Sequence, residues 1–260
     1  MDLGLKEKVI IITGGAKGIG GAISKVLAEE GAVAVIAGRK DADNQKTVRA
    51  IEKEGGKADS VVAELTHLSE CKNIVDETIR RYGRIDGVVN NAGVNDGISL
   101  EKGNPDAFYE SLNKNIVHYY AIVHYALPFL KKTKGGILNI SSKVAMTGQG
   151  NTSGYAAANG GINALTREWA VELLPYAIRV NAIVPAEVWT PQYGDWIKKQ
   201  PDSEKTIDKI VKKIPFENRF TTAEEIADTA AFLLSKRSSH TTGQILVVDG
   251  GYVHLDRAIN

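Results

Sequence analysis

Apolar and polar positions alternate along the chain in a pattern that predicts strands and helices in turn. Short runs, most of them rich in Val, Ile and Ala, lie at residues 9–12, 32–37, 57–62, 87–90, 136–141, 178–183 and 244–248. Helical patterns separate them, at about 18–30, 42–54, 106–130 and 155–174, with further helices ending at 82 and starting near 223. Strands that are apolar throughout are buried on both faces, which is typical of a parallel sheet between helix layers. The pattern therefore predicts a single α/β domain over residues 1–260, with a doubly wound parallel sheet of about seven strands and helices on both faces.

Two segments depart from the simple alternation. Pro128 lies near the end of the long helix predicted at 106–130 and is expected to bend or end it. Residues 185–220 form an irregular insert after the strand at 178–183 and are rich in Trp, Pro, Lys and Asp. An insert at the carboxyl end of a strand is well placed to cover a ligand crevice, so we expect it to cover a substrate. The alternative is a solvated surface excursion.

Composition removes several classes of function. The formal net charge is +1, which gives no bulk attraction to nucleic acid or to an anionic membrane. The apolar runs are too short to span a bilayer, and the first residues lack the apolar core of a signal peptide. The single cysteine, Cys71, excludes an internal disulfide and is expected to be a small buried hydrophobe. We therefore expect a cytoplasmic protein without a nucleic-acid or membrane partner.

The five histidines show no spacing typical of metal ligands. His118 and His124 are six residues apart, and this separation does not bring two side chains together on a helix. The sequence therefore predicts no metal site.

A glycine-rich turn joins the first predicted strand to the first predicted helix. It reads Thr-Gly-Gly-Ala-Lys-Gly-Ile-Gly over residues 13–20. Gly14, Gly18 and Gly20 permit a tight turn and close approach of the backbone, while the start of the helix presents free N–H groups and a positive dipole end. Such a turn between a strand and a helix predicts that a diphosphate binds here.

Further motifs along nearly the whole chain support the prediction of a bound diphosphate. The segment Asn-Asn-Ala-Gly at 90–93 ends the fourth predicted strand, Asn115 lies within the long helix, Asn-Ile-Ser-Ser at 139–142 ends the fifth strand, and Asp-Gly-Gly at 249–251 follows the last. With the Thr-Gly-x-x-x-Gly-x-Gly turn, this set resembles the short-chain dehydrogenase/reductase family. The resemblance implies a Rossmann fold, a nicotinamide dinucleotide cofactor and hydride transfer.

The resemblance also implies which residues bind the cofactor. They follow the first, second, third, fourth and sixth strands or lie at the active site: Gly14, Lys17, Gly18, Ile19, Gly20, Arg39, Glu64, Leu65, Asn91, Ala92, Gly93, Tyr155, Pro185, Val188 and Thr190. Glu64 takes the place of an Asp that contacts adenine in many members of the family.

The end of the second predicted strand distinguishes NAD from NADP. An acidic residue there would bind the ribose 2′-hydroxyl of NAD and repel a 2′-phosphate. This chain has Gly38 and Arg39 instead, and Lys17 adds positive charge nearby. Because a guanidinium can pair with a phosphate in a bidentate manner, the cofactor is predicted to be NADP in preference to NAD. The alternative is that both cationic side chains are merely solvated.

The predicted catalytic residues are Asn115, Ser142, Tyr155 and Asn159. By resemblance, Tyr155 is the acid/base and Ser142 holds the substrate oxygen. The family pattern Tyr-x-x-x-Lys is broken, because Asn159 stands where the lysine is expected. Lys143, next to Ser142, is a conceivable substitute cation. Its alternatives are a place in the substrate pocket or solvation, since side chains of adjacent strand residues point to opposite faces.

Three loops resemble those of sugar-oxidising members of the family, particularly L-fucose dehydrogenases. They lie at 91–97, 147–154 and 185–191, and a fourth segment at 238–244 also matches. The candidate substrate residues in and beside these loops are polar or aromatic: Asp96, Lys143, Gln149, Asn151, Glu187 and Trp189. A polyol needs convergent donors and acceptors, whereas a steroid or lipid pocket would favour apolar residues. For each polar residue, a hydrogen bond that merely stabilises its loop is the alternative.

Two classes of function follow. One is an NAD(P)-dependent oxidoreductase that transfers hydride between the cofactor and a small sugar, converting an L-fucose-like aldose to a lactone, with turnover impaired by Asn159. The other is a catalytically silent dinucleotide-binding protein on the same scaffold. The long helix carries apolar residues on more than one side, and together with the resemblance this predicts a homotetramer.

Overall fold

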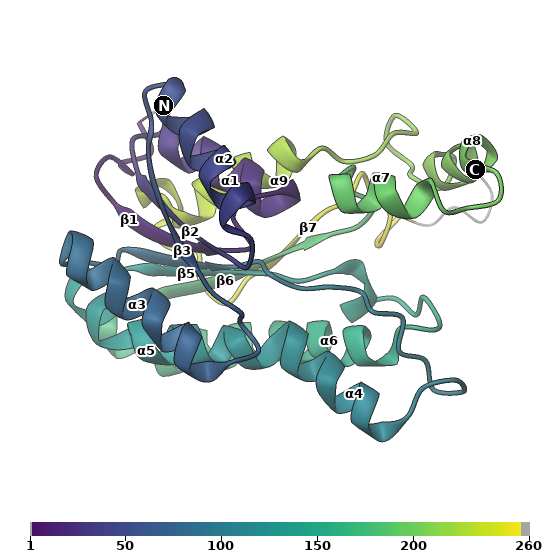
Figure 1. Ribbon diagram of the computed structural model, residues 1–260, viewed down its shortest axis with the longest axis horizontal. Helices are drawn as coiled ribbons and strands as arrows, with labels where there is room; N and C mark the ends of the chain where they lie inside the picture. The colour runs from purple at the N-terminus through teal and green to yellow at the C-terminus, as the bar shows by residue number, and fades with distance from the viewer. Residues whose placement is uncertain (1, 256–260) are drawn as a thin grey trace.

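The computed structural model describes residues 2–255 and is built on one parallel sheet (Figure 1). Its strands are β1 (Val9–Thr13), β2 (Val33–Gly38), β3 (Lys57–Val62), β4 (Gly87–Asn90), β5 (Gly136–Ile140), β6 (Arg179–Pro185) and β7 (Ile245–Val248). They lie in the order β3-β2-β1-β4-β5-β6-β7, and every neighbouring pair is parallel. The chain order reverses between β1 and β4, where ligands bind in open sheets of this kind.

Helices cover both faces of the sheet (Figure 1). One layer contains α1 (Gly18–Glu29), α2 (Asp41–Lys53) and α9 (Ala223–Leu234); the other contains α3 (Leu68–Tyr82), α4 (Pro105–Leu112), α5 (His118–Thr133) and α6 (Ser153–Glu172). The predicted doubly wound single-domain α/β fold is confirmed. Residues 1 and 256–260 of the predicted range lie outside the described part.

Strand β1 shows why its first four residues are all apolar. All five of its residues are buried. The side chain of Ile11 packs into the core that includes α3, α5 and α6, whereas those of Ile10 and Ile12 pack into the core that includes α1 and α9. Successive side chains of a strand point to opposite faces. A strand covered by helices on both faces therefore requires apolar residues on both.

The helix predicted at 106–130 is interrupted. Between α4 and α5, residues Asn113–Val117 form a turn of π-helix, and α5 continues through Pro128 to Thr133. Of the two effects predicted for Pro128, ending the helix is therefore wrong, while bending it stays a prediction. Proline removes one backbone donor, and tertiary packing of a long buried helix outweighs that local loss.

The insert at 185–220 contains two helices, α7 (Pro191–Ile197) and α8 (Ser203–Val211), which lie beyond the end of β6 (Figure 1). Each begins at a side-chain cap. The Thr190 hydroxyl accepts a hydrogen bond from the N–H of Tyr193 at 3.2 Å, and the Asp202 carboxylate accepts one from the N–H of Lys205 at 3.0 Å. The expectation of an irregular segment missed these caps, which are local sequence signals for helix starts.

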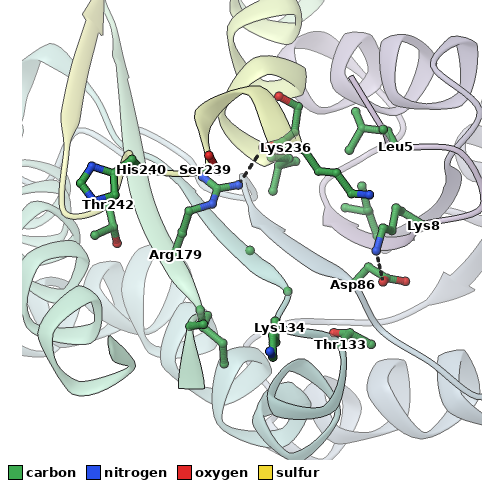
Figure 2. A pocket seen from close by; sticks show the side chains of 18 of the residues that line it. Leu5, Lys8, Asp86, Thr133, Lys134, Arg179, Lys236, Ser239, His240 and Thr242 are labelled. Carbon is green, nitrogen blue, oxygen red and sulfur yellow. Dashed lines mark hydrogen bonds and ion pairs between the residues drawn. The ribbon is translucent and has the colours of Figure 1, made fainter. Parts of the chain in front are cut away.

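A cavity of about 600 Å³ lies at the amino ends of the strands (Figure 2). Three of its charged side chains, those of Lys8, Asp86 and Arg179, are engaged in bonds near the strand starts. The ammonium of Lys8 pairs with Asp86 at 3.0 Å, and the guanidinium of Arg179 donates to carbonyl groups at the end of α9 and in the loop after it. The predicted site residues lie at the opposite edge of the sheet.

Candidate active site

The largest concentration of predicted site residues surrounds a cavity of about 700 Å³ at the carboxyl ends of the strands. Segments that follow β1, β2, β3, β4, β5 and β6 all line it. The four predicted catalytic residues and every predicted cofactor residue except Gly20 are among the lining residues. The topology therefore brings together in space residues that lie far apart in sequence.

The glycine turn has a backbone conformation and a close packing that favour glycine. Gly14 and Gly18 have φ values of +64° and +54°, in the region that glycine adopts without strain. A Cβ on Gly20 would lie 2.4 Å from both the carbonyl oxygen of Gly14 and the side-chain nitrogen of Asn91, so only glycine fits. Lys17 precedes α1 and provides no side-chain cap. The first N–H groups of α1 are thus free to bind an anion.

Hydrogen bonds of Thr13 link the end of β1 to the loop that follows β4. Its hydroxyl accepts hydrogen bonds from the N–H groups of Asn91 and Ala92 at 2.9 and 3.0 Å, and the Asn91 side chain donates to the Thr13 carbonyl at 2.8 Å. These bonds fix the part of the cavity wall that lies between β1 and β4, where the chain order reverses. Thr13 lies in the glycine motif but was not among the predicted site residues, because its role depends on a partner far along the chain.

The end of the cavity beside β2 and β3 is lined by three cations, Lys17, Arg39 and Lys40, and by the carboxylates of Asp43 and Glu64. Arg39 lies on the wall with its side chain 73% exposed and approaches Glu64 at 3.5 Å. Lys17 also lines the wall and pairs with Asp43 at 2.6 Å. Both ion pairs are solvent-exposed and therefore weak, so a phosphate can compete for these cations.

The carboxylate of Glu64 forms hydrogen bonds within its own loop. Its carboxylate accepts hydrogen bonds from the N–H and the hydroxyl of Thr66 at 3.2 and 3.1 Å. Burial would raise the pKa of Glu64, but these bonds and Arg39 outweigh burial and hold the pKa below its usual value. Glu64 is thus anionic at neutral pH and fixed by Thr66 at the end of β3.

Tyr155 and Ser142 meet at the other end of the cavity. Burial raises the pKa of the Tyr155 phenol above its usual value, while hydrogen bonding with the side chains of Ser142 and Asn159 acts in the opposite direction. Among the described residues, no cation contributes to this pKa. The phenol is therefore protonated at neutral pH.

Asn159 lies one helical turn after Tyr155. Its side chain is 2% exposed and donates to the backbone carbonyl of Tyr155 at 2.8 Å. This bond stays within α6 and holds the amide beside the phenol, but an amide carries no charge. The electrostatic stabilisation of a phenolate that a lysine would supply is missing at this position.

Lys143 does not supply the missing charge. It is buried, forms an ion pair with Glu187, and lies 4.3 Å from the centre of the Tyr252 ring. The other carboxylate oxygen of Glu187 accepts a hydrogen bond from the Tyr193 hydroxyl at 2.7 Å. Two predicted substrate residues thus contact each other and connect the loop after β5 with helix α7.

Tyr193 is a wall residue that sequence reasoning missed. It lines the cavity from α7, and its ring packs against Trp189, Trp196 and Phe220 at centroid distances of 6.2, 5.4 and 5.3 Å. Trp189, a predicted substrate residue, is 46% exposed in this cluster. The available sequence signal for Tyr193 was an aromatic residue within the insert. Its hydrogen bond to Glu187 depends on the tertiary fold and could not be predicted from the sequence.

Like Lys143, Glu187 and Trp189, the remaining predicted substrate residues are not among those that line the cavity. Asp96 accepts a hydrogen bond from Ser111 at 2.8 Å and lies 4.0 Å from Lys114. Gln149 and Asn151 are exposed in the loop before α6.

Asn115 sits in the π-helical turn between α4 and α5. Its side-chain carbonyl accepts a hydrogen bond from the N–H of Val94 at 2.7 Å, and its amide donates to the Ser111 carbonyl at 2.8 Å. Turns of π-helix frequently mark functional sites. Asn115 thus positions the loop after β4, while His118, one turn later, lines the cavity and was considered in the sequence only as a metal ligand.

Other chemistries find no support among residues 2–255. No group of three or more His, Cys, Asp or Glu side chains there is arranged to hold a metal ion. No helix in this range combines the length and the apolar character needed to cross a membrane. Cys71 is fully buried, and burial raises the pKa of its thiol to about 11, which opposes a role as a thiolate nucleophile.

Known proteins resemble this chain over nearly its whole length. Residues 14–253 match the sequence profile of a family described as enoyl-(acyl carrier protein) reductase. A 3-oxoacyl-[acyl-carrier-protein] reductase FabG of Thermotoga maritima is 36% identical over 251 residues, 96% of this chain and 99% of its own. The L-fucose dehydrogenase of Bos taurus is 35% identical over 245 residues, 94% of this chain and 88% of its own.

Comparison with solved structures points to the same group of proteins. Cj0485 dehydrogenase superposes with a TM-score of 0.95 at 45% identity, covering 100% of this chain and 99% of its own. An F189W actinorhodin polyketide ketoreductase, solved with NADPH, gives a TM-score of 0.91 at 25% identity, covering 96% of this chain and 98% of its own. The profile match and these similarities show that the protein belongs to the short-chain dehydrogenase/reductase family of oxidoreductases, which bind NAD(P).

Proposed function

We propose that the protein oxidises a small sugar, an L-fucose-like aldose, at its anomeric carbon to a lactone, with NADP preferred over NAD. The observation that carries the proposal is one cavity that joins a phosphate-binding glycine turn to Ser142 and Tyr155 beside the polar wall residue Tyr193. The similarity to L-fucose dehydrogenases supports the sugar. The 3-oxoacyl reductase is equally similar, but a hydrogen-bonding wall suits a polyol better than an acyl chain.

A nicotinamide dinucleotide fits the residues present. The free N–H groups at the start of α1 suit its diphosphate, and Gly20 leaves no Cβ in the way. Asn91, Ala92, Gly93, Pro185, Val188 and Thr190 complete the proposed binding surface. When bound, the cofactor supplies the hydride acceptor.

The chain's own residues supply the proton chemistry. In oxidation the anomeric C–H bond breaks as hydride leaves, and the hydroxyl proton must leave the same oxygen. Ser142 holds that oxygen by a hydrogen bond, and the Tyr155 phenolate accepts the proton. Tyr193 in the cavity wall orients the other hydroxyl groups, and Glu187, itself held by Lys143, fixes the Tyr193 hydroxyl.

Turnover is impaired because the phenolate is scarce. An unperturbed tyrosine has a pKa of about 10, so about one molecule in a thousand is ionised at pH 7. Burial raises the pKa of Tyr155 further, and Asn159 brings no opposing charge. This feature also favours the second candidate, a dinucleotide-binding protein without catalysis.

The proposal places the protein in the cytoplasm as a homotetramer. Helices α4–α6 carry exposed aromatic and apolar side chains, among them Tyr109 at 69%, Tyr120 at 56% and Val171 at 68%. Such a face is typical of a surface between copies in a closed assembly. Light scattering at micromolar concentration should give four times the mass of 28.0 kDa, and a monomer would contradict the assembly.

The substrate is tested by a panel of cofactor-absorbance assays. L-Fucose and related aldoses should reduce NADP, and the lactone should be detectable as the product. A simple secondary alcohol, a steroid and, in the reverse direction, a 3-oxoacyl thioester should react less well. Preference for any of these three over every aldose would refute the sugar. Binding of NADP without turnover of any substrate would favour the silent protein.

The cofactor preference is tested by Arg39→Ala. A charge-assisted pair contributes about 1.5–3 kcal/mol, so the variant should bind NADP about tenfold or more weakly and bind NAD unchanged. Titration calorimetry with both cofactors measures this. Lys72→Ala, an exposed cation on α3, is the matched control and should leave both affinities unchanged. Equal affinities of the unaltered chain for NAD and NADP would contradict the preference.

The defect at Asn159 is tested by Asn159→Lys. The ammonium should favour the phenolate, and since general acid–base catalysis contributes about 10²–10⁴-fold, kcat at pH 7 should rise within that range. Asn159→Gln lengthens the side chain without adding charge and should not raise kcat. The Kd for NADP should change little, because the diphosphate site is separate. Family-like turnover in the unaltered chain at neutral pH would show the argument wrong.

A further inference from the structure

A buried ion pair lies directly behind the wall of the cavity. Lys143 follows the wall residue Ser142, and Glu187 lies between the wall residues Ala186 and Val188, but neither charged residue lines the cavity itself. Their side chains are only 11% and 12% exposed and pair with each other. The two charges therefore belong to the layer that supports the wall.

The ion pair joins segments that follow three different strands. Lys143 follows β5, Glu187 follows β6, and Tyr252 follows β7. The ammonium of Lys143 lies 4.3 Å from the centre of the Tyr252 ring, a distance typical of a cation–π contact. The ammonium is thus held by a carboxylate and by an aromatic ring from separate parts of the chain.

Tyr193 connects this ion pair to the wall. One carboxylate oxygen of Glu187 pairs with Lys143, and the other accepts a hydrogen bond from the Tyr193 hydroxyl at 2.7 Å. Burial raises the pKa of Tyr193, and the charge of Glu187 raises this pKa further, so the hydroxyl keeps its hydrogen. Since an ionised carboxylate only accepts hydrogen bonds, the direction of this bond is fixed.

Helix α7 has few other buried attachments. Of its seven residues only Ile197 is buried, and Trp196 is 47% exposed. The ion pair between Lys198 and Asp195 is 79% and 71% exposed, and such pairs contribute little. The bond from Tyr193 to the buried ion pair is therefore well placed to determine where α7 lies.

Loss of one charge would disturb the other, because a buried charge without its partner is strongly unfavourable. Without Lys143, the Glu187 carboxylate would turn to water or take up a proton, and Tyr193 would lose its fixed partner. Resting on the proposed function, we propose that Lys143 is a positioning residue: through Glu187 it fixes Tyr193 relative to Ser142 without touching the sugar. The sequence had favoured direct contact of both charged residues with the substrate.

Hydrogen exchange of the α7 amides tests this attachment without a substrate. A hydrogen bond to a charged group contributes about tenfold or more to an equilibrium, so Lys143→Met should speed exchange in α7 by about that factor and leave α9 unchanged. Lys205→Met, in an exposed ion pair on α8, is the matched control and should leave α7 unchanged.

Glu187→Gln keeps the size of the side chain but removes its charge, and it should speed exchange in α7 as well. This variant also decides the result if Lys143→Met does not fold. Unchanged exchange in α7 after either substitution, in a folded protein, would overturn the proposal.

Single-turnover oxidation of several aldoses tests the effect on chemistry. A displacement of about 1 Å can cost about 100-fold in rate, so Lys143→Met should lower the rate at saturating sugar by up to that factor. A positioning residue should affect every reactive aldose alike and leave the Kd for NADP unchanged. Lys143→Arg retains the charge and should restore most of the rate. A loss confined to aldoses that share one hydroxyl group would instead indicate direct contact and overturn the proposal.

A double-mutant cycle tests whether Lys143 acts through Tyr193. Tyr193→Phe removes only the hydroxyl and should slow the reaction. Adding Lys143→Met to Tyr193→Phe should then cost little more, because both substitutions remove the same contact. Losses that simply multiply would show that Lys143 acts elsewhere and would contradict the proposal.

The experiments also separate this proposal from the proposed function. Failure of every sugar to react would overturn the proposed function, while hydrogen exchange would still decide whether Lys143 fixes α7. Unchanged exchange together with sugar oxidation would overturn the role of Lys143 and leave the proposed function intact.

Discussion

The hydroxyl of Thr13 holds the ends of β1 and β4 at the separation on which the whole site depends. Two N–H groups of the loop after β4 donate to it, and the Asn91 side chain returns a bond to the Thr13 carbonyl. Asn91 in turn leaves no room for a Cβ on Gly20. The glycine turn and the loop after β4 therefore share one geometry, and a change in either disturbs both.

Binding and chemistry make different demands on the two ends of the cavity. A diphosphate is held by backbone N–H groups and nearby cations, which this chain retains. Proton transfer needs an ionised phenol in a buried place, and burial of Tyr155 without a neighbouring cation opposes ionisation. The same scaffold can therefore bind a cofactor well and turn it over slowly, and both the impaired enzyme and the silent binder follow from this separation.

The sequence predicted most of the fold because its signals there are local. Continuous apolar runs such as that of β1 follow from burial on both faces, and the glycine turn follows from backbone conformation. The gathering of the candidate catalytic residues around one cavity also followed, since the carboxyl ends of parallel strands meet at one edge. The helices of the insert were missed, although the Thr190 and Asp202 caps are visible in sequence.

Pairings between distant segments could not be predicted. Lys143 and Glu187 are individually plausible substrate ligands, and only the tertiary fold shows that they neutralise each other. The ring of Tyr252 reaches Lys143 from the segment after β7, a contact that the spacing of the two residues does not reveal.

The most direct test of the central claim is the pH dependence of hydride transfer in the unaltered chain. Single-turnover oxidation of the sugar, with NADP saturating, should be followed from pH 6 to about pH 10. Enzyme returned from each pH to pH 7 serves as the stability control. The base must be ionised and the pKa of Tyr155 is raised, so the rate should climb about tenfold per pH unit across neutrality without levelling. A plateau reached below about pH 8 would mean that the phenol ionises easily despite Asn159 and would contradict the account.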